Sequence, residues 1–227
     1  MKYLELHSWD LQYSEAVKVQ RELKDRLILK APRMDLRLVA GADVSYSKGS
    51  DVFFSSVVVF EMPDMKIVEE STAKGRVDFP YIPGLLSFRE APVLIKAFEG
   101  LKNIPDMIIF DGQGIAHPRG IGLASHMGLV LDCSSIGCAK KILVGDHDPV
   151  GNEVGDYSPL VFQDNVVGAA LRTRKNVKPV FISPGHKMDM PSAVETVMKT
   201  CRGYKLPEPT RQAHLSVNRF RASHQIT

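Results

Sequence analysis

A short apolar run that ends in an aspartate and a glycine-rich loop constrains the fold more than any other part of this chain. Residues 107–110 read Met-Ile-Ile-Phe and are followed by Asp111 and by the sequence Gly112-Gln113-Gly114. A short apolar run bounded by turn residues is typical of a buried strand. A carboxylate at the end of such a strand is costly to desolvate unless a cation or hydrogen bonds compensate it. The segment therefore predicts a buried strand with a polar site at its carboxyl end.

A second segment repeats this layout. Residues 38–42 read Leu-Val-Ala-Gly-Ala and lead into Asp43. Two carboxylates on neighbouring strands suit Mg²⁺, which proteins hold with one or two carboxylates, water and substrate phosphate. The alternative interpretation is that each aspartate only caps a strand end or a turn.

Length and charge limit the class of protein. The chain has 227 residues, of which 44% are hydrophobic and 24% charged, so we expect one globular domain over residues 1–227. The net charge of +3 permits a polyanionic partner without requiring one. Basic residues accumulate toward the C-terminus.

Cysteines and apolar runs indicate the compartment. Cys133, Cys138 and Cys201 form no C-x-x-C pair, which argues against both a disulfide framework and a structural zinc site. Residues 1–5 lack the apolar stretch of a signal peptide, and no run approaches the roughly 20 apolar residues of a membrane span. We expect a soluble, cytoplasmic monomer without membrane association.

Hydrophobic periodicity and turn residues predict alternating strands and helices. Strands are expected at about residues 37–46, 52–60, 65–74, 107–111, 134–139, 159–163, 166–172 and 179–183. Helices are expected at about 14–29, with Ser14 as the cap, and at 85–101, 124–132, 191–200 and 209–221. Pro92 predicts a break in the second of these. A hairpin followed by strand–helix–strand crossovers predicts a mixed sheet with helices on its faces.

Two further residues are candidates for chemistry. Glu90, near a predicted helix start, is either a third acidic group at the metal or a charge that favours the positive end of the helix. His214 would orient or deprotonate an attacking water, although a lone helical histidine is more often a surface or packed residue. His117 and His126 have the same two interpretations.

Lys140 and the segment around Tyr81 suggest contacts with phosphate and bases. Lys140 follows an apolar strand and is either a phosphate partner or a solvated surface charge. Pro80, Tyr81, Ile82 and Pro83, hereafter the wedge segment, place an aromatic ring between two stiffening prolines. Such a segment resembles the apolar wedges that enter base steps, unless Tyr81 is buried in the core. The glycines of Gly112-Gln113-Gly114 and of residues 120–122 allow backbone to approach a ligand closely, but match no dinucleotide or P-loop motif.

Taken together, these motifs resemble the endonuclease V family of nucleic-acid repair nucleases. The resemblance is carried by residues 39–45, 79–90, 111–119, 122–128, 136–140, 180–186 and 207–211. In order and spacing it covers about residues 7–220. Cys138, Lys141 and the loop 142–158 depart from the pattern, but none of them touches the acids or the wedge segment.

The resemblance implies a fold and an activity. The fold would be ribonuclease H-like, of the α/β class, with a mixed five-stranded central sheet and flanking helices. The activity would be Mg²⁺-dependent hydrolysis, with Mn²⁺ as a substitute, of the second phosphodiester bond 3′ to a deoxyinosine in DNA. The products would carry a 3′-hydroxyl and a 5′-phosphate.

The resemblance also assigns roles residue by residue. Asp43 and Asp111 would bind the metal, and Glu90 would complete the acidic cluster through water. His214 would assist the nucleophilic water, and Lys140 would neutralise phosphate charge. The wedge segment would separate the strands, with Tyr81 filling the space that the base leaves. The backbone around Gly84, Leu85, Gly112 and Gly122 would line a hypoxanthine pocket.

Three alternatives stay open. One is an endoribonuclease that cuts at inosine in single-stranded RNA. Another is a less specific, structure-directed nuclease that cuts flaps or mismatches. The third is a binding module without catalysis, against which three acids beside a phosphate would argue.

Overall fold

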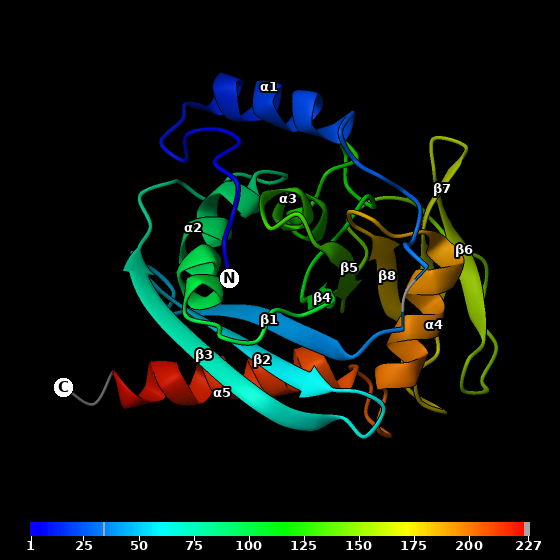
Figure 1. Ribbon diagram of the computed structural model, residues 1–227. Coiled ribbons are helices and arrows are strands. Elements are labelled where there is room, and N and C mark those ends of the chain that lie inside the picture. Colours follow the sequence, from blue (N-terminus) through cyan, green and yellow to red (C-terminus); the bar gives the residue numbers. More distant parts are fainter. Residues whose placement is uncertain (34, 225–227) are drawn as a thin grey trace.

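A single mixed sheet runs through the molecule (Figure 1). The computed structural model describes residues 1–33 and 35–224. Within these residues the sheet has eight strands in the order β3-β2-β1-β4-β5-β8-β7-β6. The strands are β1 (Leu38–Tyr46), β2 (Val52–Glu61), β3 (Lys66–Arg76), β4 (Met107–Phe110), β5 (Ser134–Ala139), β6 (Tyr157–Phe162), β7 (Asn165–Leu171) and β8 (Val180–Pro184).

The expected α/β class and mixed sheet are confirmed, but the expected count of five strands is wrong. Strand β8 pairs antiparallel with β5, with Ala139 opposite Phe181. Strands β7 and β6 then continue the same sheet by antiparallel pairing. The parallel part is the group β1, β4 and β5, in which β4 is hydrogen-bonded on both sides.

The described residues form five helices. They are α1 (Tyr13–Lys24), α2 (Leu86–Glu99), α3 (Leu123–Val130), α4 (Met190–Thr200) and α5 (Glu208–Ser223). Of these, α1 packs on α3 rather than on the sheet (Figure 1). Helix α1 begins after Gln12, whose backbone N–H donates to Glu15 at 2.8 Å, so Ser14 is not the cap and the helix ends earlier than expected. The break predicted at Pro92 is also wrong, because α2 continues through it with most of its length buried. No described helix combines the length and apolar character needed to cross a bilayer.

The helices cover the two faces of the sheet separately. Helices α2 and α3 pack on the face formed by Ala40, Ala42, Ile108 and Phe110. Helix α4 packs on the opposite face, and α5 lies across β1 and β2 (Figure 1). Since side chains alternate along a strand, odd-numbered residues of β1 point to the face that α5 covers. Asp43 is therefore directed toward α5.

Gly41 lets α5 approach β1 closely. A Cβ atom at this position would lie 2.0 Å from the Pro209 carbonyl oxygen and 2.7 Å from the Thr210 nitrogen. These are backbone atoms of the first turn of α5, so they cannot move without the helix. The glycine thus sets how near α5 comes to the strand that carries Asp43.

We expect Gly41→Ala to displace α5 and to cost about 3 kcal/mol of unfolding free energy, as overpacking of a core contact does. The matched control is Gly75→Ala in β3, where the new Cβ would meet only the flexible end of Lys96, at 3.1 Å. Denaturant unfolding of both variants measures the difference. Equal stability of the two variants would contradict this account of the β1–α5 contact.

Candidate active site

Asp43 and Asp111 meet at one edge of the sheet, as the sequence predicted. Asp111 directly follows β4, and its backbone N–H donates to the Ala42 carbonyl at 3.2 Å. Ala42 pairs with Phe110, so the next residues, Asp43 and Asp111, lie beside each other where the pairing of β1 with β4 ends; Asp43 is within β1, and Asp111 directly follows β4. Both carboxylates are largely shielded from solvent. Their convergence is the arrangement that a shared metal site requires, and Asp43 Oδ1 also accepts the backbone N–H of Val44 at 2.8 Å.

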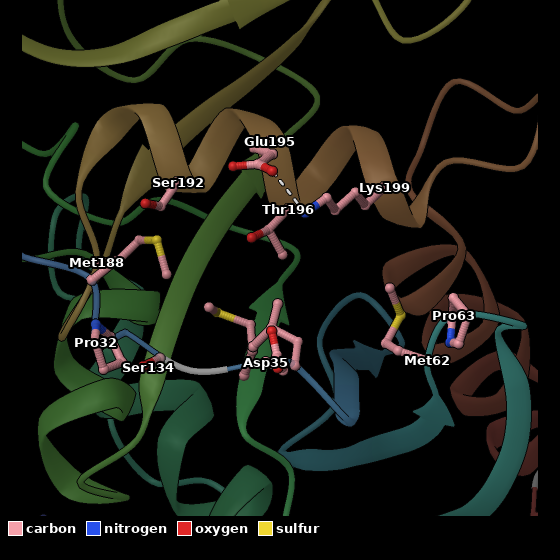
Figure 2. Close-up of a pocket in the computed structure, with 13 residues that line it drawn as sticks. Pro32, Asp35, Met62, Pro63, Ser134, Met188, Ser192, Glu195, Thr196 and Lys199 are labelled. Atoms are coloured by element: carbon pink, nitrogen blue, oxygen red, sulfur yellow. Dashed lines mark ion pairs between the residues drawn. The ribbon is translucent and has the colours of Figure 1, made fainter.

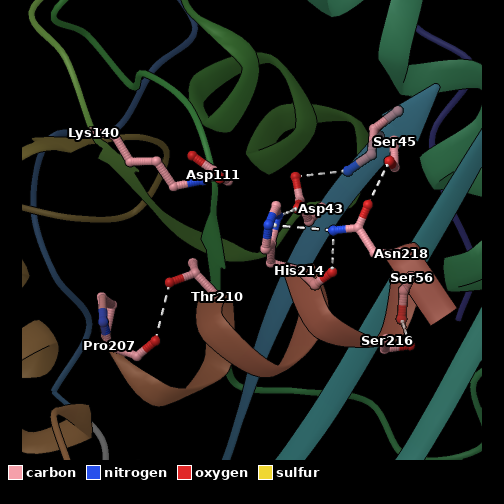
Figure 3. Close-up of polar contacts among 11 residues, drawn as sticks. Asp43, Ser45, Ser56, Asp111, Lys140, Pro207, Thr210, His214, Ser216 and Asn218 are labelled. Carbon is pink, nitrogen blue, oxygen red and sulfur yellow. Dashed lines mark hydrogen bonds and ion pairs between the residues drawn. The ribbon is translucent and has the colours of Figure 1, made fainter. Parts of the chain in front are cut away.

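His214 reaches the same place from α5. Its Nδ1 donates to Asp43 Oδ2 at 2.7 Å, and Asn218 Nδ2 lies 3.2 Å from its Nε2 (Figure 3). Asn218 is itself bonded to Ser45 Oγ at 2.9 Å. The hydrogen bond to Asp43 raises the pKa of His214 and places the ring proton on Nδ1, so that Nε2 carries the lone pair and faces the Asn218 amide. Nε2 is thus the atom that would take a proton, and 47% of the side chain is exposed.

The three side chains form a group with metal-binding character. Ligand atoms of Asp43, Asp111 and His214 all lie within 4.8 Å of one another. Carboxylate oxygens are the ligands that Mg²⁺ and Mn²⁺ prefer, so the two aspartates fit such an ion. Lys140 follows β5, and its Nζ lies 2.5 Å from Asp111 Oδ2 (Figure 3). This ion pair partly neutralises the negative charge of Asp111.

Glu90 joins the two aspartates from the other face of the sheet. It lies on α2 and is 9% exposed. Burial, followed by the charges of Asp43 and Asp111, raises the pKa of Glu90 to about 8. Its carboxylate is outside the close group of three, which agrees with a role through water. Burial and the Asp43 charge also raise the pKa of Asp111.

These pKa shifts predict that the metal-free protein loses stability as the pH rises. Glu90 holds its proton to about pH 8 in the folded state but releases it near 4.5 when unfolded. The contribution of Glu90 to the free energy of unfolding is therefore complete below pH 4.5 and is lost as the pH rises through 8. Between pH 6 and 8 the loss is about 2 kcal/mol, or about 6 °C in Tm.

Thermal unfolding in EDTA at the two pH values measures this effect. In Glu90→Gln the difference in Tm between the two pH values should shrink, because the amide does not titrate. Addition of Mg²⁺ should restore part of the stability of the parent at pH 8, where the carboxylates are charged. The same pH dependence in parent and variant would contradict the account.

The wedge segment holds an exposed tyrosine between two anchored ends, while its Ile82 packs against the cluster of Ala16, Leu85 and Phe88. Tyr81 is 65% exposed, so it is not a core residue. Arg89 Nη1 donates to the Phe79 carbonyl at 2.8 Å on one side of the segment. On the other side, Gly84 has a φ of +80°, which favours glycine. Burial, followed by the charge of Glu90, raises the pKa of the Tyr46 phenol.

The residues expected to line a base pocket pack against other parts of the protein. Leu85 is fully buried beside Ala16 and Phe88. A Cβ at Gly122 would meet the Gln113 carbonyl oxygen at 2.4 Å, so this glycine permits two backbone segments to touch. At Gly112 a Cβ would only touch Leu123, at 3.5 Å. The pocket stays a prediction.

The two remaining histidine candidates have structural partners. His126 is fully buried and hydrogen-bonded to Ser87 Oγ at 2.9 Å and to His7 Nε2 at 2.7 Å. His117 is bonded to the Gly84 carbonyl at 3.0 Å. Sequence reasoning missed Asn218 and Tyr46, which border the site. Asn218 follows His214 by one helical turn, and that spacing was the available signal.

A cavity of about 380 Å³ lies at the opposite edge of the sheet (Figure 2). It is lined by Leu36, Met107 and Ser134, which precede or begin β1, β4 and β5. Glu195 and Lys199 of α4 form an ion pair of 2.7 Å beside it. This cavity shares no residue with the acidic group, which lies at the carboxyl ends of the same strands.

Comparisons with known proteins identify the family of the chain. A family model described as Endonuclease V matches residues 21–215. The endonuclease V of Dehalococcoides mccartyi is 50% identical over 216 residues, which cover 95% of this chain and 97% of that protein. The crystal structure of endonuclease V from Bacillus subtilis superposes with a TM-score of 0.94 at 32% identity, covering 99% of both chains.

Similar structures include complexes with nucleic acid. Ciona intestinalis endonuclease V, in complex with a 24mer DNA containing an inosine followed by a ribo-adenosine, superposes with a TM-score of 0.84. It is 28% identical and covers 92% of this chain and 98% of that one. With the family model and the relatives covering nearly the full length, the chain belongs to the endonuclease V family and is a nuclease.

Proposed function

We propose that this nuclease hydrolyses the second phosphodiester bond on the 3′ side of a deoxyinosine in DNA and requires Mg²⁺, for which Mn²⁺ substitutes. The observation that carries the proposal is the convergence of Asp43, Asp111 and Glu90 at one sheet edge, beside an exposed wedge segment. The inosine in the DNA bound to the Ciona protein supports the choice of lesion. We further propose that the chain acts as a cytoplasmic monomer of one domain.

Asp43 and Asp111 would hold the metal, and Glu90 would act through water. A divalent ion bound there supplies positive charge that stabilises the developing charge on the phosphate. The raised pKa of Glu90 and Asp111 implies that binding requires both carboxyls to lose their protons.

His214 would accept the proton of the attacking water. Its Nδ1–H is donated to Asp43, so Nε2, which lies 3.2 Å from the Asn218 amide nitrogen, would act as the base. The water oxygen would attack phosphorus as the bond between phosphorus and the 3′ oxygen breaks. The leaving 3′ oxygen takes a proton from solvent and becomes the 3′-hydroxyl, and the phosphate stays on the 5′ side of the cut. Lys140 would transfer its contact from Asp111 to a phosphate oxygen when substrate binds.

The wedge segment would recognise the damaged duplex. A deaminated adenine pairs weakly, so extruding it requires less free energy than extruding an intact base. Tyr81 would stack in the vacated space, and the backbone around Gly84, Leu85, Gly112 and Gly122 would contact the hypoxanthine. Because this pocket and the acids are separate, the cut falls at a fixed offset from the lesion.

RNA is the second candidate substrate. The ribo-adenosine after the inosine in the Ciona complex supports it, because that protein is seen with a ribose at this position. Cleavage rates on matched single-inosine DNA and RNA oligonucleotides decide between the two. Faster cleavage of DNA supports the proposal, and faster cleavage of single-stranded RNA replaces it. Equal cleavage of inosine-free flaps or mismatches would instead indicate a structure-directed nuclease.

A further inference from the structure

Three side chains donate hydrogen bonds to one backbone oxygen, that of Gly84. The oxygen lies 2.9 Å from Gln20 Nε2, 3.0 Å from His117 Nε2 and 2.6 Å from Arg119 Nη2. We name these three residues the Gly84 clamp. Since a carbonyl oxygen has two lone pairs, three donors are more than an ordinary turn requires. Gly84 directly follows the wedge segment, so the clamp holds its carboxyl end.

The members of the clamp are also bonded to one another. Arg119 Nε donates to Gln20 Oε1 at 2.5 Å, and the Arg119 backbone N–H donates to His117 Nδ1 at 3.2 Å. Because His117 accepts at Nδ1, its proton is on Nε2 and points at the Gly84 oxygen. Burial and the Arg119 charge lower the pKa of His117 to about 4, so this neutral form persists at neutral pH. The donors are therefore held in one arrangement.

Gln20 is the member that no motif indicated. It is 1% exposed on the buried face of α1, where Ala16 and Leu23 are its apolar neighbours. A buried amide is unfavourable unless both of its ends are hydrogen-bonded. Here the NH₂ group bonds Gly84 and the oxygen accepts from Arg119, which explains a polar residue at this position.

The other end of the wedge segment is anchored as well. Arg89 donates to the Phe79 carbonyl at 2.8 Å and lies over the Phe53 ring at 4.8 Å from its centroid. Between the two anchors, Tyr81 remains exposed. A ring that enters a base stack can separate the bases only if the backbone that carries the ring keeps its position.

We propose that Gln20, His117 and Arg119 are positioning residues that brace the wedge segment, so that opening of a duplex at the lesion depends on helix α1. The inference rests on the proposed function, because the wedge role is part of it. Its consequence is specific to duplex DNA. A single strand needs no separation, so loss of the clamp should leave its cleavage nearly unchanged.

The test uses the full chain with Gln20→Met, which keeps the length of the side chain and removes its hydrogen bonds to Gly84, Arg119 and the Ile121 carbonyl. We expect kcat/KM on a single-inosine duplex to fall about 10-fold, and on the same single strand less than 3-fold. The matched control is Leu23→Ala, on the same buried face of α1, which lowers stability but leaves the clamp intact. Leu23→Ala should change kcat/KM by the same factor on the duplex and on the single strand. Arg119→Met provides a second variant if Gln20→Met does not fold.

Hydrogen exchange of the backbone amides in residues 79–86 gives a readout that is independent of activity. Exchange there should increase in Gln20→Met more than in Leu23→Ala at matched stability. Unchanged exchange, or equal losses on duplex and single strand, would overturn the clamp. A parent that cleaves neither inosine substrate would contradict the proposed function instead, and the exchange data would still decide whether the clamp braces the segment.

Discussion

Asp111→Asn is expected to lower the cleavage rate of an inosine-containing duplex by about 1,000-fold while leaving binding nearly unchanged. Asparagine keeps the shape of the side chain but removes the charge that the metal and Lys140 require. Loss of several kcal/mol of charge stabilisation in the transition state corresponds to a factor of this size. Single-turnover cleavage and an equilibrium binding assay in EDTA separate the two effects.

The control lies at the other end of the same strand. Asp106, just before β4, accepts the backbone N–H groups of Arg37 and Leu38 at 2.8 and 2.9 Å. Asp106→Asn retains an acceptor oxygen and should cleave at the rate of the parent. If Asp111→Asn cleaves at the rate of the parent in Mg²⁺, Asp111 is not part of the active site.

Tyr81→Ala is expected to reduce cleavage of the inosine duplex about 10- to 100-fold, because base–aromatic stacking contributes about 1–3 kcal/mol. Binding of the metal should not change, since Tyr81 contributes no ligand to the acidic group. The measurement compares kcat/KM for an inosine duplex with that for the matched adenine duplex. A Mn²⁺ titration of Tyr81→Ala and of the parent compares their affinities for the metal.

Two variants bracket this result. Tyr81→Phe keeps the ring and should retain most of the preference for inosine. Tyr157→Ala removes another exposed tyrosine, on the edge strand β6, and should have no effect. If Tyr81→Ala discriminates inosine from adenine as well as the parent does, Tyr81 does not act as the wedge.

Local patterns were sufficient to locate the strands. The run 52–60 was expected as a strand and the structure has Val52–Glu61, because an apolar run between turn residues has few other solutions. The two aspartates were also predictable, since each ends such a run. Eight strands were expected from these patterns, and the count of five came only from the family resemblance.

Long-range packing was not predictable from the sequence. The bond between His214 and Asp43 joins residues 171 positions apart and depends on the close approach of α5 at Gly41. Gln20 left a weak signal, a polar residue within the apolar face of α1, but nothing local identifies Gly84 as its partner. The continuity of α2 through Pro92 likewise depends on burial against the sheet rather than on local preference.

The most direct test of the central claim is cleavage of an end-labelled duplex with one inosine, analysed at single-nucleotide resolution with and without Mg²⁺. The account predicts one product, cut at the second bond 3′ to the inosine, that forms only when Mg²⁺ is present. Cleavage in EDTA, or cuts whose positions do not follow the inosine when it is moved along the strand, would contradict it.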